Sequence, residues 1–299
     1  MKIKSKMKHV FAVMLAFVCI IMIIPAMKVE AASVTINGGY TSRGNAYNWG
    51  MYSQTNSILV VLPENENDFW VNVNIPSDSH VYARCSYEND YAGMSLESWT
   101  VNSIIESHDS RDSVYDSNTV LPFLAVAIDN NGSATSTNYI HINRGTNYSG
   151  IMYITISMGE RFKTGRGVYN FNGTANNSGN SPYVNIGRDS SELTLDLTNN
   201  NSIPTGAIVT SVSTSGSQSP SQGSVHHMIM PSNVGVWFTS LNASNSSGRY
   251  NVGAGDGVFV KQMWTFKYNA MATAKSTMRN VRITIDWRYD IANNGYHAF

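Results

Sequence analysis

Residues 203–239 read IPTGAIVTSVSTSGSQSPSQGSVHHMIMPSNVGVWFT, and this stretch decides the fold class. Apolar residues recur in a roughly alternating pattern through Val209 and Val212, and again from Val225 to Met230. Between these runs, residues 213–223 are almost entirely Ser, Gly, Gln and Pro, a composition typical of turns. A period of two buries one face of a strand and leaves the other face in water. Such strands, separated by polar turns, predict an antiparallel β-sandwich.

The same pattern extends over most of the chain. Residues 69–75 and 281–287 alternate between apolar and polar side chains, whereas residues 173–190 are rich in Gly, Asn and Ser and show no period. We therefore predict an all-β protein of two antiparallel, jelly-roll-like β-sandwich domains, residues 33–172 and 191–299, joined by a linker at residues 173–190. One helix is expected at residues 94–105, although β-branched residues make its periodicity ambiguous. Residues 139–142 and 151–156 are expected to pair with each other across a turn.

Residues 1–32 have the features of a cleaved secretory signal peptide. An apolar run at residues 10–25 precedes a cleavage motif at residues 29–31, and the segment begins with four lysines, Lys2, Lys4, Lys6 and Lys8. An uncleaved membrane anchor is the alternative, but the run is shorter than the ~20 residues that a membrane span needs. The large residues Phe17 and Val18 disfavour a lipid anchor on Cys19. The sequence thus predicts a secreted protein, either extracellular or associated with the cell surface.

Cleavage changes the charge and leaves one cysteine. Residues 1–32 remove five lysines and Glu30 from 20 basic and 20 acidic residues, which leaves 15 against 19 and a net charge of −4. Nucleic acids and anionic membranes both need a basic face, so neither is expected as a partner, and no stable membrane insertion is predicted. Cys85 then stands alone, and we expect it to be buried in a strand. A secreted chain without an intrachain disulfide, behind a lysine-rich signal, is typical of a Gram-positive bacterium.

The densest acidic cluster is the candidate metal site. Calcium binds where several oxygen ligands converge, and secreted β-sandwiches can hold it in acidic loops. Calcium is therefore the cofactor that the sequence suggests, although the spacing fits no EF-hand. The alternative is a solvated loop in which Arg111 balances the charge. The proposed ligands are Glu106, Asp109, Asp112 and Asp116.

No motif in the chain predicts catalysis. The Gly-x-Ser-x-Gly elbow of serine hydrolases is absent. His226 and His227 are adjacent in a predicted strand, so they point to opposite faces and cannot bind one ion together. We therefore expect a protein that is not an enzyme, and a hydrolase of sandwich fold remains the alternative.

Aromatic residues are the candidate ligand-binding groups. Tyr47, Trp49 and Tyr52 lie in an expected loop at residues 38–56, where exposed rings could stack on the faces of sugars. Trp264 and Trp287 are in phase with apolar neighbours and are expected in a core. Together with the signal peptide, these features predict an extracellular binding module whose partner is a cell-wall or matrix glycan, or another protein. A structural component of a coat, matrix or fibre is a further alternative.

Both predicted domains resemble modules of exported hydrolases. Asp68-Phe69 opens a strand that ends at Ile75-Pro76, and the unit closes with GIMYITI at residues 150–156; this pattern resembles the bacterial pre-peptidase C-terminal domain. In the second unit, Ile203-Pro204, a long alternating strand and Met230-Pro231-Ser232 are similar in outline to the P-domain of secreted subtilisin-like proteases. Both families are β-sandwich accessory modules, so the resemblance implies no catalytic residues.

Overall fold

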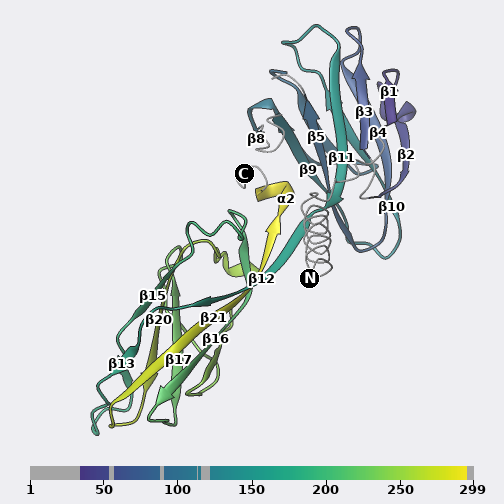
Figure 1. Cartoon of the computed structure of the whole chain (residues 1–299). Helices are drawn as coiled ribbons and strands as arrows, with labels where there is room; N and C mark the ends of the chain where they lie inside the picture. The colour runs from purple at the N-terminus through teal and green to yellow at the C-terminus, as the bar shows by residue number, and fades with distance from the viewer. Residues whose placement is uncertain (1–33, 54–56, 88–90, 113, 116–121, 295–299) are drawn as a thin grey trace, which may run out of the picture.

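Strands form nearly all the regular structure in the computed structural model, which describes residues 34–53, 57–87, 91–112, 114–115 and 122–294 (Figure 1). Within those residues, helical structure is limited to α2 (Ile291–Asn294) and to three short 3-10 turns, Arg43–Asn45, Ser110–Asp112 and Ala254–Asp256. The all-β fold class is confirmed. The predicted signal peptide lies outside the described residues. None of the described helices has the length and apolar character to cross a membrane.

The first sandwich consists of two sheets around one apolar core. One sheet has the order β1-β3-β11-β5-β9-β8 and the other the order β2-β4-β10-β6-β7. Neighbouring strands are antiparallel, except that β1 is parallel to β3 and β2 is parallel to β4. The strands of the first sheet are β1 (Val34–Asn37), β3 (Ser57–Leu62), β11 (Met152–Glu160), β5 (Ser79–Tyr87), β9 (Pro122–Asn130) and β8 (Val114–Tyr115). Those of the second are β2 (Tyr47–Met51), β4 (Asp68–Ile75), β10 (Ser136–Asn143), β6 (Ser95–Trp99) and β7 (Ile104–Asp109).

The second sandwich also has two sheets, and all of its pairings are antiparallel. One sheet has the order β12-β21-β16-β19, with β13 also on β21, and the other the order β14-β20-β17-β18, with β15 also on β20. The strands of the first sheet are β12 (Phe162–Asn170), β21 (Ser276–Asp290), β16 (Ile208–Ser219), β19 (Ser247–Arg249) and β13 (Ala175–Asn177). Those of the second are β14 (Arg188–Asp189), β20 (Met263–Ala270), β17 (Val225–Pro231), β18 (Phe238–Thr239) and β15 (Leu193–Asp196).

The alternating pattern in the sequence determines which side chains fill the two cores. Strand β4 buries Phe69, Val71, Val73 and Ile75 and turns the residues between them outward. Two separate clusters of buried apolar residues result, one in each sandwich. Trp264 is fully buried and Trp287 packs against the second cluster, as predicted. Cys85 is also fully buried, as predicted.

Strand β16 of the second sandwich is longer than predicted. Strand β16 continues through residues 213–219, which the composition predicted to be a turn, and pairs with β21 as far as Ser219. The polar residues of this stretch occupy mainly its water-facing side, and Thr214 is buried. A Cβ at Gly216 would lie 2.9 Å from the sulfur of Met278, so this glycine permits close packing of the two strands.

The boundary between the sandwiches lies at Arg161, which corrects the predicted domain limits. Strand β11 ends at Glu160 and β12 begins at Phe162, and β12 pairs with β21 of the second sandwich along its whole length. Residues 162–172 therefore belong to the second sandwich and not to the first. The sequence could not reveal this, because a strand at these residues could equally close the first sandwich or open the second.

Residues 173–190 are part of the second sandwich rather than a linker. Strands β13 and β14 pair with β21 and β20. The side chain of Asn177 donates to the carbonyl of Arg188 (2.6 Å) and accepts from the amide of Gly179 (2.9 Å). Gly179 has φ +85°, and a Cβ there would lie 2.1 Å from the carbonyl oxygen of Thr273. The Asn and Gly content thus stabilises ordered turns.

Two further local predictions are wrong. Residues 94–105 form β6, a turn and the start of β7, because Leu96 and Ser98 alternate inward while Glu97 and Trp99 face outward. The period of two prevails over a partial helical period. Residues 139–142 and 151–156 do not pair with each other: β10 pairs with β4 and β6, whereas β11 pairs with β3 and β5 in the opposite sheet.

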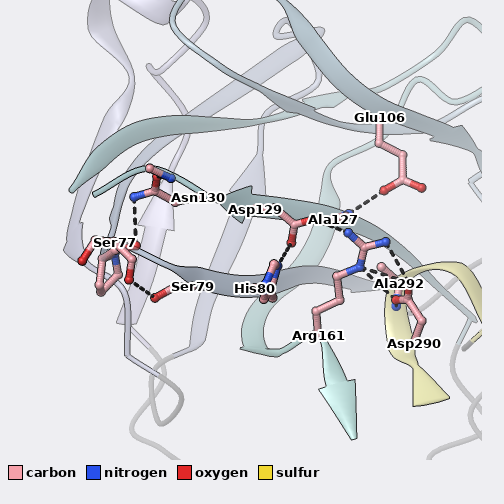
Figure 2. Close-up of polar contacts among 12 residues, drawn as sticks. Ser77, Ser79, His80, Glu106, Ala127, Asp129, Asn130, Arg161, Asp290 and Ala292 are labelled. Carbon is pink, nitrogen blue, oxygen red and sulfur yellow. Dashed lines mark hydrogen bonds and ion pairs between the residues drawn. The ribbon is translucent and has the colours of Figure 1, made fainter. Parts of the chain in front are cut away.

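The junction is held by Arg161 (Figure 2). Its guanidinium contacts Asp129 on β9 and Asp290 at the end of β21, the latter with Nη2 and Oδ2 2.7 Å apart. The backbone carbonyl of Arg161 accepts from the amide of Ile291 (2.9 Å), and α2 packs against β9 and β5. The end of the second sandwich's longest strand is therefore anchored on the first sandwich (Figure 1).

Candidate functional site

The predicted ligand-binding aromatics do not form an exposed loop. Tyr47 and Trp49 lie in β2, which pairs with β4, and Tyr52 follows directly. All three are partly buried and pack against the first core. Tyr47 also meets Tyr40 edge to face, with ring centroids 5.4 Å apart. The placement of Tyr47 and Trp49 in a loop was therefore wrong, because both lie in a paired strand, whereas Tyr52 lies just beyond its end.

The described members of the predicted calcium site bind protein groups rather than converging on one point. Glu106 accepts from the amide of Ala127 (2.5 Å) and contacts His108 (3.0 Å). Asp112 contacts the other ring nitrogen of His108 (3.3 Å), and Asp109 pairs with Arg111. Among the residues that the structure describes, no group of three or more His, Cys, Asp or Glu could hold a metal ion. Asp116 lies outside them.

These residues lie in β7 and the 3-10 turn that follows it, and their pKa values follow from these pairings. Burial raises the pKa of Glu106, but the hydrogen bonds from His108 and the Ala127 amide outweigh burial, and the net pKa is lowered. The bond to Glu106 raises the pKa of His108. The hydrogen bonds from Arg111 lower the pKa of Asp109 to about 2. Glu106 and Asp109 are therefore ionised at neutral pH, and each already contacts a basic side chain of the protein.

The histidine pair behaves as predicted from its strand position. His227 is fully buried, with Nδ1 2.9 Å from the Thr214 hydroxyl, while Nδ1 of His226 lies 3.0 Å from the carbonyl of Ser240. The two rings thus have different surroundings. Burial, and then the charge of His226, lowers the pKa of His227 to about 4. His227 is a neutral core residue and not a ligand for a metal.

A group of aromatic side chains lies on the outer face of β4, β10 and β6. Trp70 stands opposite His141, and Tyr139 opposite Trp99, so the pleat directs these four side chains to one face. We call Trp70, Trp99, Tyr139 and His141 the aromatic platform. All four are partly exposed.

The rings of the platform are closely packed. Trp70 and His141 are stacked, with centroids 4.0 Å apart and planes at 13°, and Trp99 lies 5.8 Å from Trp70. The guanidinium of Arg43 lies 5.2 Å from the Trp99 ring and 5.9 Å from the Trp70 ring, and it donates to the carbonyl of Val101 (2.9 Å). The positive charge of the guanidinium is attracted to the electron-rich faces of both indole rings.

A hydrogen-bonded network on the same outer face of the sheet fixes the platform. His141 contacts Glu97 through Nδ1 and Asp68 through Nε2, both at 2.8 Å. The indole N–H of Trp99 donates to the same Glu97 oxygen (2.8 Å), and Asn143 donates to Asp68 (2.8 Å). His141 therefore bridges Glu97 on β6 and Asp68 on β4, and these contacts fix the orientation of its ring.

Exposed apolar side chains extend the platform at the edge of the sheet. Val101, Ile104 and Ile105 are 56%, 45% and 41% exposed, and Ile104 pairs directly with Trp99. Neighbouring exposed apolar side chains are typical of a binding surface rather than of a face that only contacts water. The platform therefore combines flat rings, fixed polar groups and an apolar margin.

The sequence analysis did not select the platform residues, although part of the signal was present. Trp70 occupies the outward phase of the clearly alternating residues 69–75, and a large apolar ring in that phase is anomalous. Trp99 fell within the expected helix, which hid its phase. The meeting of Glu97, His141 and Asp68 depends on three strands that are distant in sequence, so no local pattern could reveal it.

Comparisons with known proteins place the chain in a family. No family model matches it. The uncharacterized protein YbdN of Bacillus subtilis (strain 168) is 37% identical over 262 residues, which cover 88% of this chain and 90% of YbdN. Similar solved structures include the pre-peptidase C-terminal domain of a Bacillus anthracis collagenase. It is 11% identical, with a TM-score of 0.27, and covers 38% of this chain and 94% of that domain.

Another similar structure is CorA, a surface-associated copper-binding protein of Methylomicrobium album BG8. It is 7% identical, with a TM-score of 0.25, and covers 38% of this chain and 98% of that one. Both TM-scores are too low to carry an argument about this chain. The match to YbdN is much stronger, because 37% of the residues are identical over 88% of this chain. The chain therefore belongs to the same family as YbdN of Bacillus subtilis.

Proposed function

We propose that this protein is an extracellular binding protein that recognises a glycan through the aromatic platform of its first sandwich. The observation that supports this most is the pair Trp70 and Trp99, partly exposed on the water-facing side of a sheet and held in place by Glu97 and His141. Export rests on the predicted signal peptide at residues 1–32.

The chemistry of the platform suits sugars. The C–H face of a pyranose stacks on an indole, and its hydroxyls bond to fixed charged groups at the ring edges. Asp68 and Glu97 supply acceptors, and the Arg43 guanidinium supplies donors at the rim. Rings and polar groups that are already fixed lose little conformational entropy on binding.

The same groups are less suited to hydrolysis of a glycan. Glycosidases place two carboxylates on either side of the scissile bond, with substrate or water between them. Here one imidazole lies within 2.8 Å of both Asp68 and Glu97. The space between the two carboxylates is therefore filled by His141.

Co-sedimentation with insoluble polysaccharides and peptidoglycan, followed by a soluble glycan array, tests the proposal on the chain without residues 1–32. We expect binding that Trp70→Ala and Arg43→Ala weaken by at least about tenfold, as is usual for central aromatic and arginine contacts. Tyr183→Ala is the matched control, because Tyr183 is 94% exposed in a loop of the second sandwich. Binding to no glycan, or equal loss in the control, would overturn the proposal.

A further inference from the structure

A pocket lies in the second sandwich, away from the aromatic platform. Its volume is about 430 Å³, within the range of small-molecule sites. The start of β12, the end of β21, the loop at residues 201–205 and the residue Lys261 before β20 surround it. It is lined by Lys163, Asn201, Ser202, Ile203, Pro204, Thr205, Lys261 and Tyr289.

The lining is positively charged, in a chain that is poor in lysine. Outside residues 1–32 the chain has four lysines, and two of them, Lys163 and Lys261, line this pocket. No acidic residue is part of the lining. Lys267, by contrast, pairs with Asp189 at 2.7 Å.

Neither pocket lysine is neutralised within the described part of the chain. Lys261 donates to the hydroxyl of Thr205 (3.3 Å), and no described carboxylate forms an ion pair with Lys261 or Lys163. Two uncompensated ammonium groups at one pocket raise the local concentration of anions.

Tyr289 supplies a third observation that is independent of charge. It is 3% exposed, and its cross-strand partner is Lys163. Its hydroxyl is buried and has no hydrogen-bond partner among the described residues. Burial, and then the charge of Asp290, raises the pKa of this hydroxyl, so it remains a donor. Buried donors almost always have an acceptor, and a bound group would provide one.

We propose that this pocket binds an oxyanion, a phosphate, sulfate or carboxylate group, between Lys163 and Lys261 with the Tyr289 hydroxyl as an additional donor. Charge-assisted bonds to such groups are stronger than neutral ones and suit lysine as a point charge. The inference rests on this pocket alone and is independent of glycan binding by the platform.

Calorimetric titration of the chain without residues 1–32 with inorganic phosphate, sulfate and glucuronate tests the proposal, at low ionic strength because salt screens such sites. Glucose is the neutral control. We expect saturable binding of at least one anion and none of glucose. Lys163→Gln and Lys261→Gln should each weaken binding by about tenfold. A response to phosphate and sulfate alone would indicate a phosphoryl or sulfuryl ligand, and a response to glucuronate alone an acidic sugar.

Two variants separate a built site from general electrostatics and from a structural role. Lys275→Gln makes the same change in charge at the other end of β21, and we expect it to leave the affinity within about twofold. Tyr289→Phe should weaken binding while leaving the melting temperature of the free protein unchanged or higher, because its hydroxyl has no described partner. No saturable binding, an equal effect of Lys275→Gln, or destabilisation by Tyr289→Phe would each overturn the proposal.

Discussion

Acidification should destabilise the second sandwich through His227. This side chain is fully buried beside Thr214 and Phe266, and within the described residues its Nε2 has no hydrogen-bond partner. The unfolded chain takes up a proton on this ring near pH 6.5, whereas the folded chain does so only near pH 4. Between these values the unfolded state binds more protons, so stability falls as the pH falls through this window.

The size of the effect follows from the two pKa values. They are 6.5 and about 4, and one pKa unit corresponds to about 1.36 kcal/mol. The full loss below pH 4 is therefore roughly 3 kcal/mol, a large share of the 5–15 kcal/mol that is typical of a domain. The loss should begin below about pH 6.5 and be nearly complete at about pH 4.

Urea denaturation at several pH values between 7.5 and 4, on the wild type and on His227→Gln, measures this term. Glutamine can still bond to Thr214 but does not titrate, so the difference between the two proteins removes the contribution of the carboxylates. We expect the wild type to lose roughly 3 kcal/mol relative to the variant over this range. A difference that does not change with pH would refute the assignment of His227 as a buried neutral group.

Three other predictions concern the junction and the first sandwich. Arg161→Gln should lower the free energy of unfolding, measured by calorimetry, by roughly 2 kcal/mol, because Asp129 and Asp290 lose their shared cation. Arg161→Lys, which keeps the charge, should lower it less. Arg144→Met should lower the free energy of unfolding of the first sandwich by roughly 3 kcal/mol in urea denaturation. Arg144 is 2% exposed, and its partners within the described residues are backbone carbonyls, which would lose their donor. Cys85 is fully buried, and burial raises the pKa of its thiol, so a thiol reagent should label it only after unfolding; rapid labelling of the native protein would contradict its burial.

The fold class could be read from the sequence because strand periodicity is local. The alternation at residues 69–75 and 281–287 reports burial on one face directly, and the structure shows the same buried residues. The domain boundary could not be read in this way. It depends on β12 pairing with β21, more than a hundred residues away, and the Gly- and Asn-rich residues 173–190 resembled a linker although their side chains bond to the backbone.

The candidate site was also hard to predict from the sequence, because it too depends on contacts between residues that are distant in the chain. The sequence analysis selected Tyr47 and Trp49, but both rings pack against the core, whereas Trp70 and Trp99 face outward. The acidic residues after position 105 are close in sequence, yet Glu106 turns toward β9 and Asp109 pairs with Arg111. Proximity in sequence therefore did not correspond to convergence in space.

The affinity of the platform for its best glycan, compared between the wild type and the double variant Trp70→Ala/Trp99→Ala, tests the central claim most directly. Both proteins, and the Tyr183→Ala control, would be titrated calorimetrically after equal melting behaviour has been checked. The account predicts a loss of roughly hundredfold or more in the double variant, since two central aromatic contacts disappear, and no significant loss in the control. A double variant that folds and binds within about twofold of the wild type would contradict the assignment of the platform as the binding site.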